Sequence, residues 1–548
     1  MKQNPGEEPA PSELTGQTAQ AAQMGHLAAR DAGILPLNEA LSKKSRRRFL
    51  GLTTDDAIKY FFGGNAALSI VVLFLIMLLL LKEGFDFVPL NRFNTQIYRQ
   101  AGLEYVDILR GQVEDHATLG RSLQQLRLRE FRALDKQGLT LEAVNARLAP
   151  LDAFTQRFSE AASGHQEMLS TLSDEAVAVK QRVSDAREEN PKLDAASAFD
   201  FRKETAPIRE TLPAYKELNA GLASALGALA AQPADELVLP TDRPVLLKFQ
   251  KQLRVYAAGF PVLERKMERW DPLRPVPAYF ALTSFLFGPH WITASFWQDW
   301  YGVLPLFFGS LAVSTVALVL AVPFSLGAAI YINQIASRGE QNFIKPYIEF
   351  IAAIPSVVFG FFGVAVLGSA LRTMSGWKAL AWVPFFPMTE RLTIFTAGCL
   401  LALMAIPTIF TLAEDALNNV PRAFTEASTA LGATKFQTIV RIMFPAALSG
   451  IISAVLLGLG RVIGETMVVL LCVGGRTQIP DFVHQGIGAF FQPAHTMTGI
   501  IAQEMGEASK GSLEWRALFM VGMLLFVVSL CINYAAQLVV KRYKVSIG

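Results

Sequence analysis

Residues 304–331 read LPLFFGSLAVSTVALVLAVPFSLGAAIY, a stretch without a single charged side chain. A helix needs roughly 20 mainly apolar residues to cross the hydrocarbon core of a bilayer, so this stretch is long enough to span a membrane. Five other apolar stretches have comparable length: Phe61 to Leu81, Phe350 to Leu371, Leu392 to Leu412, Ala446 to Gly475 and Ala517 to Val540. The sequence therefore predicts an all-α membrane protein with about six spans.

The composition supports this prediction. Charged residues make up 18% of the chain, hydrophobic residues 51%, and the mean hydropathy is +0.32, whereas soluble proteins average about 25% charged residues. The net charge of +3 is small and divided among the flanks of the spans, so it gives no argument for nucleic acid as a partner. The three cysteines all lie inside predicted spans, and the pattern predicts neither a disulfide framework nor a metal site.

Basic residues indicate the orientation. A basic cluster, Lys43 to Arg48, precedes the first span, and no A-x-A-like cleavage site follows that span, which favours an uncleaved anchor over a signal peptide. Under the positive-inside rule, the remaining basic flanks of this multi-pass protein place both termini in the cytoplasm and residues 82–302 on the outer side of the membrane, which is the periplasm in the case of a cell inner membrane. These flanks are Arg338 and Lys345, then Arg422, Lys435 and Arg441, then Lys541, Arg542 and Lys544.

The chain divides into four predicted segments. Residues 1–42 form a disordered cytoplasmic tail, 43–81 the basic flank and first transmembrane helix, 82–277 a periplasmic helical insertion, and 278–548 a core with five further transmembrane helices. Within the insertion, apolar residues recur at spacings of three and four, which is typical of amphipathic helices. We expect breaks at Gly138, near Pro191 and through the stretch from Pro233 to Pro244.

A motif lies between the fourth and fifth spans, where residues 426–445 read EASTALGATKFQTIVRIMFP. Its spacing resembles the EAA loop of ABC import permeases, E-A-A-x3-G-x9-I-x-L-P, with Ser428 for the second Ala and Phe444 for the Leu. We expect Glu426, Ala427 and Ser428 to form a short helix with a small-residue face for a partner. Gly432 would allow a change of helix direction, and Pro445 would sit in the first turn of the next span. An ordinary amphipathic turn at the membrane surface is the simpler alternative.

Two ionisable residues stand in the fifth stretch. A charge at the bilayer centre costs about 2.5 to 3.5 kcal/mol on insertion scales, so such residues usually face a partner or a water-filled path. Arg461 and Glu465 are four apart, and on one helix they would share a face and pair. Arg461 offers a fork of donors that suits phosphate oxygens. We therefore place Arg461, Glu465 and Thr466 on a substrate path, while a purely structural pair remains an equal alternative.

A closer resemblance covers about half the chain, from Phe285 to the C terminus, together with the anchor span. The sequence is similar to the PstC-type phosphate permease family in several segments: Phe285 to Gly288, Gly302 to Leu311, Ala353 to Gly360, Arg461 to Met467, Thr496 to Thr498, and Glu507 with Ala508. The chain departs from that family in the length of the segment before Phe285.

The resemblance implies the type I permease fold of ABC importers, a location in the cell inner membrane with residues 82–302 in the periplasm, and a set of partners. These are a second permease of PstA type, a cytoplasmic ATPase dimer of PstB type, an external phosphate-binding protein, phosphate itself and membrane lipid. The chain would be a transport subunit and not an enzyme, without catalytic residues, bound cofactor or metal, while its partners would use ATP. In agreement, the sequence contains no G-x-x-x-x-G-K-[ST] loop.

Two other functions compete with this hypothesis. A permease for another oxyanion, such as molybdate or sulfate, would share the spans and the EAA loop. A membrane-anchored helical sensor or scaffold would work through residues 82–277, but it would need only one or two spans and would not explain the EAA loop.

Overall fold

A computed structural model describes residues 54–135, 137–189, 198–293, 295, 297–380, 382–383 and 385–543. The predicted tail, residues 1–42, and the basic cluster that follows it lie outside the described residues. The chain forms two compact units, Met1–Leu78 and Leu79–Gly548. In the first unit, the described residues belong to helix α3 (Thr54–Phe85), and apolar side chains such as Phe74 and Leu75 are exposed on it. A helix that is apolar on every face is suited to lipid surroundings.

Six helical stretches among the described residues are long and apolar enough to cross a membrane, which confirms the predicted number. They are α3 continued by α4 (Phe87–Gln100); α15 (Leu304–Ile330) with the π-helical turn Tyr331–Ile335; α17 (Ser356–Phe362) with the turn Gly363–Leu367 and α18 (Gly368–Ser375); α19 (Ile394–Asn418); α21 (Lys435–Thr438) with the turn Ile439–Met443 and α22 (Phe444–Ile463); and α26 (Leu513–Tyr543).

The boundaries of the spans differ from those predicted. The first candidate stretch runs to Gln100 and so includes residues 82–100, which were assigned to the insertion. The differences in the third and fifth spans have a clear physical reason. The third begins at Ser356 and not at Phe350, because a separate helix, α16 (Arg338–Ala353), ends just before it. Ile354 is extended (φ −72°, ψ 126°) since the residue before a proline avoids the α region, and Pro355 follows. The fifth span ends at Ile463, where the expected single stretch divides into α22 and a short helix, α23 (Met467–Cys472).

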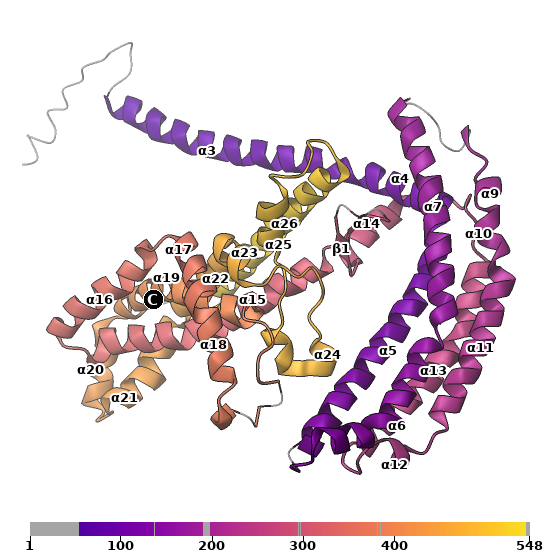
Figure 1. The fold of residues 1–548 in the computed structure, drawn as a ribbon. Helices are drawn as coiled ribbons and strands as arrows, with labels where there is room; N and C mark the ends of the chain where they lie inside the picture. Colours follow the sequence, from indigo (N-terminus) through magenta and orange to yellow (C-terminus); the bar gives the residue numbers. More distant parts are fainter. Residues whose placement is uncertain are drawn as a thin grey trace, which may run out of the picture. The chain divides into compact units, whose positions relative to one another are not determined.

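Helices α15, α19 and α22 pack against one another within the second unit (Figure 1). Two glycines allow the close approach. A Cβ atom on Gly398 would lie 2.5 Å from Val316 Cγ1, and one on Gly458 would lie 2.5 Å from Ile409 Cγ1. Small residues at helix contacts are how membrane helices obtain van der Waals packing without a hydrophobic driving force.

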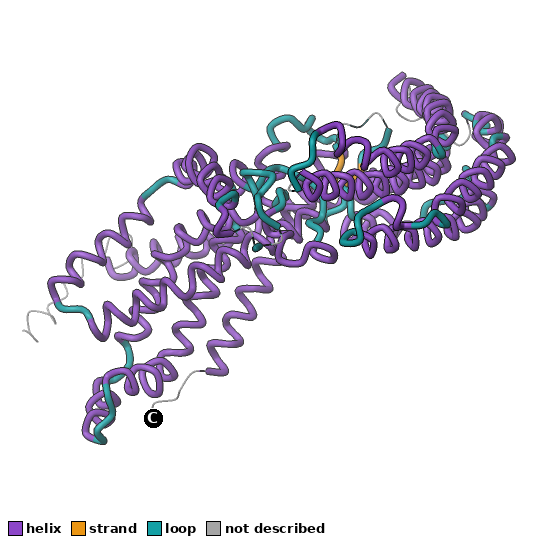
Figure 2. The backbone as a smooth tube through the Cα atoms, turned by 60° about the horizontal axis from the view of Figure 1, so that its bottom comes forward, coloured by secondary structure: helices purple, strands orange, loops and turns teal. Residues whose placement is uncertain are grey.

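Within residues 82–277, the described part of the chain is mainly helical, as predicted (Figure 2). After α4 it contains α5 (Leu103–Asp135), α6 (Leu141–Glu160), α7 (Ser163–Glu189), α9 (Phe201–Glu204), α10 (Ala206–Glu210), α11 (Leu212–Ala230), α12 (Ala234–Leu237) and α13 (Arg243–Glu268). Gly138 has a positive φ of 75° and separates α5 from α6, so this predicted break is confirmed. The stretch from Pro233 to Pro244 holds the short α12, turns and the first two residues of α13, and the break near Pro191 lies outside the described residues.

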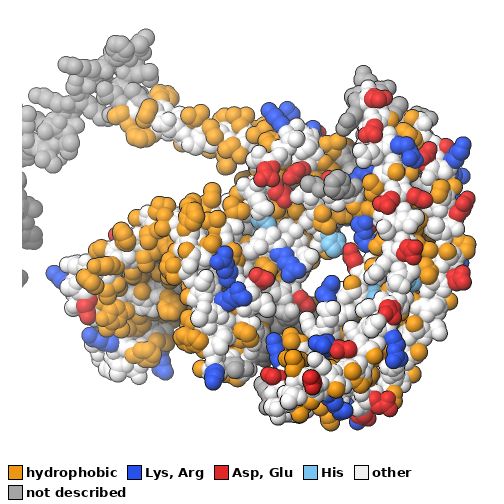
Figure 3. Space-filling view, in the orientation of Figure 1, with side chains coloured by type: hydrophobic (Ala, Val, Ile, Leu, Met, Phe, Trp, Pro, Cys, Tyr) orange, Lys and Arg blue, Asp and Glu red, His pale blue; other side chains and the backbone are white. Residues whose placement is uncertain are grey.

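The helical insertion has its own apolar core. Leu123, Leu126, Phe154, Phe158 and Leu246 are almost fully buried in one cluster of α5, α6, α11 and α13. In Figure 3, charged side chains of both signs are spread over the insertion, whereas hydrophobic side chains dominate the surface of the candidate membrane helices that follow it. One unit therefore contains a water-facing bundle and a lipid-facing bundle.

The insertion meets the bundle of candidate membrane helices beside α14 (Ala278–Phe287) and a two-stranded hairpin. In the hairpin, β1 (Trp291–Ile292) pairs antiparallel with β2 (Trp300–Tyr301). Lys180 Nζ of α7 donates to the carbonyl oxygen of Trp297 at 2.7 Å, and the guanidinium of Arg110 lies 3.6 Å from the centre of the Trp297 ring. Within this unit, α5 and α7 are thus attached to the loop that leads into α15.

Candidate functional site

The EAA-like segment folds as two short helices joined by a tight turn. Helix α20 (Arg422–Ala430) ends in a Schellman arrangement, in which Gly432 N–H donates to Thr429 O at 2.9 Å and Ala433 N–H donates to Ser428 O at 3.1 Å. Gly432 has φ +79°, so it supplies the left-handed conformation that the motif requires. The predicted change of helix direction at Gly432 is present.

Ser428 is not on the exposed face that was expected to hold Glu426, Ala427 and Ser428 together. Glu426 and Ala427 are exposed on α20, but Ser428 is buried, and its hydroxyl lies 2.8 Å from that of Thr438 on α21. The reason is helical geometry, because a residue two positions from Glu426 points to another side of the helix. Ser428 therefore joins the two short helices to each other and does not form part of the outer surface.

Large apolar side chains are exposed around this turn. Leu431 is 88% exposed and Phe436 is 74% exposed, and Phe424 and Val440 also face outward. Pro445 stands at the second position of α22, directly after a π-helical turn, where a first-turn proline was expected. An exposed apolar patch on a segment that connects two spans is typical of a protein-protein contact.

The polar residues of the fifth span lie where its helix breaks. Arg461 is in the last turn of α22, Gly464 ends the helix, and Glu465 and Thr466 precede α23. The expectation that Arg461 and Glu465 share one helix face is wrong, because the helix does not continue through both. The described residues contain no ion pair between them.

Each of these two residues has its own partner. Arg461 Nη1 donates to the hydroxyl of Thr408 on α19 at 2.7 Å. The Glu465 carboxylate accepts the backbone N–H of Met467 at 3.2 Å, at the start of α23, and the Glu465 carbonyl accepts the hydroxyl of Thr498 at 2.8 Å. Arg461 is exposed on this chain, while Glu465 and Thr466 are half-buried.

A cluster of hydroxyl groups adjoins the break. Ser310, Ser314, Thr496, Thr498 and Glu465 line a cavity of about 10 Å³ together with apolar side chains. Ser310 Oγ accepts the backbone N–H of Met497 at 3.0 Å, so the start of α25 (Met497–Glu504) is fixed against α15. A cavity of this size holds at most one water molecule. In this conformation the hydroxyl cluster leaves no room for an oxyanion.

Sequence reasoning missed two contacts at this site. Thr408 is an ordinary hydroxyl in an apolar span, and nothing in its local pattern marks it as the partner of a residue 53 positions away. Thr498 belongs to the segment Thr496 to Thr498, which was noted for its resemblance, although its contact with Glu465 was not expected. The sequence therefore marked Thr498 through its resemblance to the family, but it did not indicate that Thr498 binds Glu465.

A larger polar cavity, of about 900 Å³, lies between α5 and the loops before α19 and after α23 (Figure 3). Arg121 and Arg129 of α5 and Arg476 of the core line it, together with the carboxylates of Glu390 and Asp481. The described residues give Arg129 and Arg476 no ion-pair partner, and Arg121 Nη2 donates to the neutral hydroxyl of Thr118 at 2.7 Å.

Comparisons with known proteins agree with this architecture. Residues 321–545 match the family model for the "Binding-protein-dependent transport system inner membrane component". A probable ABC transporter permease protein YqgH of Bacillus subtilis is 33% identical over 249 residues, covering 45% of this chain and 74% of that protein. The phosphate transport system permease protein PstC of Haemophilus influenzae is 31% identical over 278 residues, covering 48% and 84%. PstC 2 of Mycobacterium tuberculosis is also 31% identical, over 273 residues.

Solved structures with similarity include the MetNI methionine ABC transporter in inward-facing conformations, at 18% identity and a TM-score of 0.33, covering 44% of this chain and 96% of that chain. A bacterial ABC transporter for alginate import is 16% identical with a TM-score of 0.35, covering 55% and 100%.

The six candidate spans among the described residues and the family match define the class of the molecule as an integral inner-membrane transport permease. The chain belongs to the family of binding-protein-dependent transport system inner membrane components, and within it to the PstC type. This membership excludes a scaffold with one or two spans.

Proposed function

We propose that this chain is one of two permease subunits of an ATP-driven phosphate importer. Its similarity to proteins named as phosphate transport permeases supports phosphate as the cargo. A second, PstA-type permease would complete the translocation path, a PstB-type ATPase dimer would use ATP, and a periplasmic binding protein would deliver phosphate. The chain itself would bind no nucleotide and catalyse no reaction.

The exposed guanidinium of Arg461 is the observation that carries the proposal. It stands on a membrane span, with a neutral hydroxyl as its partner and no counter-ion among the described residues. A guanidinium turned toward lipid costs several kcal/mol, so this face of α22 must be covered by a partner subunit or by a water-filled path. A path that carries an oxyanion meets both requirements, since the anion itself would be the transient counter-ion.

The surface around Gly432 supports coupling to the ATPase. Leu431 and Phe436 are exposed apolar anchors on a turn held by the Ser428–Thr438 contact. Such anchors bind when they enter pockets on a partner. Glu426 and Ala427 are exposed on the adjacent helix and would complete the contact.

The proposed topology follows the positive-inside rule. Both termini and the EAA-like turn would be cytoplasmic, and residues 82–302 would be periplasmic. The 900 Å³ cavity that contains Arg121, Arg129 and Arg476 would then open on the periplasmic side, where a binding protein releases its cargo.

Uptake of radiolabelled phosphate in cells that express the complete system tests the proposal. We expect Arg461→Ala to abolish uptake while membrane levels and assembly stay normal, and Arg372→Ala, a matched change at the end of α18, to transport normally. Excess unlabelled phosphate should suppress the signal, and molybdate or sulfate should not. Uptake that is suppressed by molybdate or sulfate instead would assign the chain to another oxyanion.

A further inference from the structure

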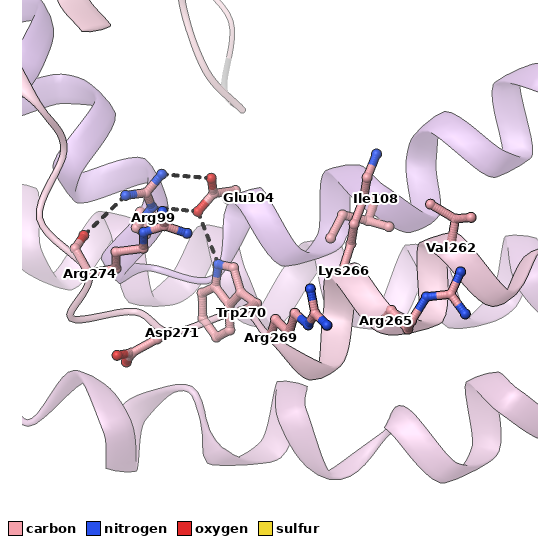
Figure 4. Close-up of a pocket in the computed structure, with 10 residues that line it drawn as sticks. All are labelled: Arg99, Glu104, Ile108, Val262, Arg265, Lys266, Arg269, Trp270, Asp271 and Arg274. Carbon is pink, nitrogen blue, oxygen red and sulfur yellow. Dashed lines mark hydrogen bonds and ion pairs between the residues drawn. The ribbon is translucent and has the colours of Figure 1, made fainter. Parts of the chain in front are cut away.

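A pocket of about 470 Å³ lies in the insertion, between the end of α4, the start of α5 and the end of α13 (Figure 4). Five cationic side chains and two carboxylates line it, together with apolar groups: Arg99, Glu104, Ile108, Val262, Arg265, Lys266, Arg269, Trp270, Asp271 and Arg274. This volume is in the range of pockets that bind small molecules.

Both carboxylates in the pocket already have partners. Glu104 accepts from Arg99 Nε at 2.6 Å, from Arg99 Nη2 at 2.9 Å and from the Trp270 indole N–H at 3.1 Å. Asp271 Oδ1 accepts the backbone N–H of Leu273 at 3.1 Å, and Figure 4 shows its carboxylate directed away from the cations of α13. Neither carboxylate is therefore a counter-ion for those cations.

The other carboxylates of the last turns of α13 are directed toward α11. Glu264 accepts the side-chain amide of Asn219 at 2.9 Å, and Glu268 pairs with Lys216. This leaves Arg265, Lys266 and Arg269 without an ion-pair partner among the described residues. Arg265 and Arg269 are also one helical turn apart, where like charges repel each other.

A simpler explanation is that these cations stabilise the C-terminal end of the α13 dipole. That explanation covers the residues of α13 alone. It does not account for Arg274 of the following loop, which brings a further guanidinium group to the same concave surface, whereas Arg99 of α4 is already neutralised by Glu104. Arg99 also donates to the Arg274 carbonyl at 3.1 Å, which fixes one wall of the pocket.

We propose that this pocket binds an anion that carries a phosphate group. Guanidinium forks match phosphate oxygens in bidentate geometry, and a cluster of them favours phosphate over a single carboxylate. The phosphate has two possible sources, a free ion or the head group of an anionic lipid. The second is a candidate because the apolar helix α14 begins four residues after Arg274 and exposes Tyr279 (69%) and Phe287 (68%). The site is separate from Arg461 and does not depend on the transported cargo.

The pocket is tested by measuring the binding of phosphate and of anionic lipid to the purified full-length chain. All variants carry Arg461→Gln, so that the proposed path residue does not contribute to the measured binding. The test variant is Arg265→Gln with Arg269→Gln, and the matched control is Lys248→Gln with Lys251→Gln on the same helix. One arm titrates inorganic phosphate in neutral detergent. The other compares nanodiscs of zwitterionic lipid with nanodiscs that contain phosphatidylglycerol, and native mass spectrometry counts the retained lipid.

We expect the test variant to bind at least tenfold more weakly than the control in one of the two arms. If the test variant loses binding of inorganic phosphate, the ligand is a free ion. If it loses binding of phosphatidylglycerol, the ligand is a lipid head group. Equal binding by test and control variants in both arms overturns the proposal. Absence of binding in both arms, with an acidic partner protein captured through Arg265 and Arg269, overturns it as well and makes the pocket a protein-docking surface. Circular dichroism of both variants checks that α13 still folds.

Discussion

Arg461 Nη1 lies 2.7 Å from the hydroxyl oxygen of Thr408, so that a side chain on α22 is held by one on α19. The hydrogen bond fixes the direction of the guanidinium at the point where α22 ends. A hydrogen bond to a charged group contributes about 1.5 to 3 kcal/mol. Thr408 is therefore a positioning residue for Arg461 in the proposed path.

Thr408→Val removes the hydroxyl and keeps the shape of the side chain. We expect phosphate uptake to fall about tenfold, mainly as a higher KM, because Arg461 remains but loses its orientation. Thr408→Ser should restore uptake. Thr411→Val is the matched control, since the Thr411 hydroxyl donates to the Pro407 carbonyl of its own helix at 2.9 Å and has no side-chain partner among the described residues. Equal KM values for Thr408→Val and Thr411→Val would contradict the positioning role.

Gly432→Val tests the coupling turn. Gly432 has φ +79°, and a left-handed conformation costs an L-residue roughly 1 to 2 kcal/mol, more for a β-branched one. We expect the Schellman turn to open and the exposed Leu431 to move, so that less ATPase co-purifies and uptake falls. Gly339→Val is the control, because Gly339 has no left-handed φ and no atom within 4 Å of an added Cβ. ATPase recovery equal to that of the control would argue against a coupling surface here.

Local patterns predicted the helices of this chain well. The span at 304–331 and the bundle built around Leu123, Phe154 and Phe158 depend on hydrophobicity and on three-four spacing, which sequence displays directly. The turn at Gly432 was predicted for the same reason, since its spacing within the EAA-like motif is local.

Tertiary relationships were not predictable in this way. The break at Gly464 to Thr466 lies inside an apolar stretch, and the groups that bond there, Thr408 and Thr498, come from distant helices. The pairing of Arg461 with Glu465 was inferred from their spacing and failed because that spacing assumed a continuous helix. Ser428 was likewise predicted on an outer face, because its contact with Thr438 depends on how the turn at Gly432 folds α21 back onto α20.

Glu130 should make the insertion sensitive to pH. The carboxylate is buried and accepts the backbone N–H of Leu239 at 3.1 Å, and burial raises the pKa of Glu130 from 4.5 to about 7. Because the folded-state pKa lies above the unfolded value, the stability contribution is present below about pH 4.5 and is lost as the pH rises through 7. The stretch around α12 should therefore loosen between pH 6 and pH 8.

A glutamate-specific protease that cuts after the exposed Glu236 measures this loosening. We expect the ratio of wild-type to Glu130→Gln cleavage rates to rise severalfold from pH 6 to pH 8, since the glutamine stays neutral and the protease's own pH dependence cancels in the ratio. Glu142→Gln, an exposed change on α6, should leave the ratio near one at both pH values. A flat ratio for Glu130→Gln would show that its ionisation does not affect this stretch.

The insertion should fold without the permease core. Its main apolar cluster draws entirely on α5, α6, α11, α12 and α13 and the turns between them. Trp297 is the main side chain from outside residues 82–277 in its second cluster, and it stacks beneath Arg110. A segment of this size can bury enough surface to be stable by itself. We therefore expect residues 82–277, expressed alone, to be soluble and mainly helical by circular dichroism, with a cooperative thermal transition.

The contacts of Trp297 predict a difference in melting temperature between two versions of the insertion. Lys180 and Arg110 lose the Trp297 carbonyl and ring when the segment is excised, and a cation-π contact contributes about 0.5 to 2 kcal/mol. Residues 82–303, which retain Trp297 and the β1–β2 hairpin, should therefore melt several degrees higher than residues 82–277. Trp297→Ala in the longer segment should remove that difference, whereas Trp377→Ala in the full chain, which changes an exposed tryptophan of the core, should leave the insertion unaffected. A strand-dominated spectrum of the shorter segment, or a non-cooperative transition, would show that the bundle depends on the permease helices for its fold.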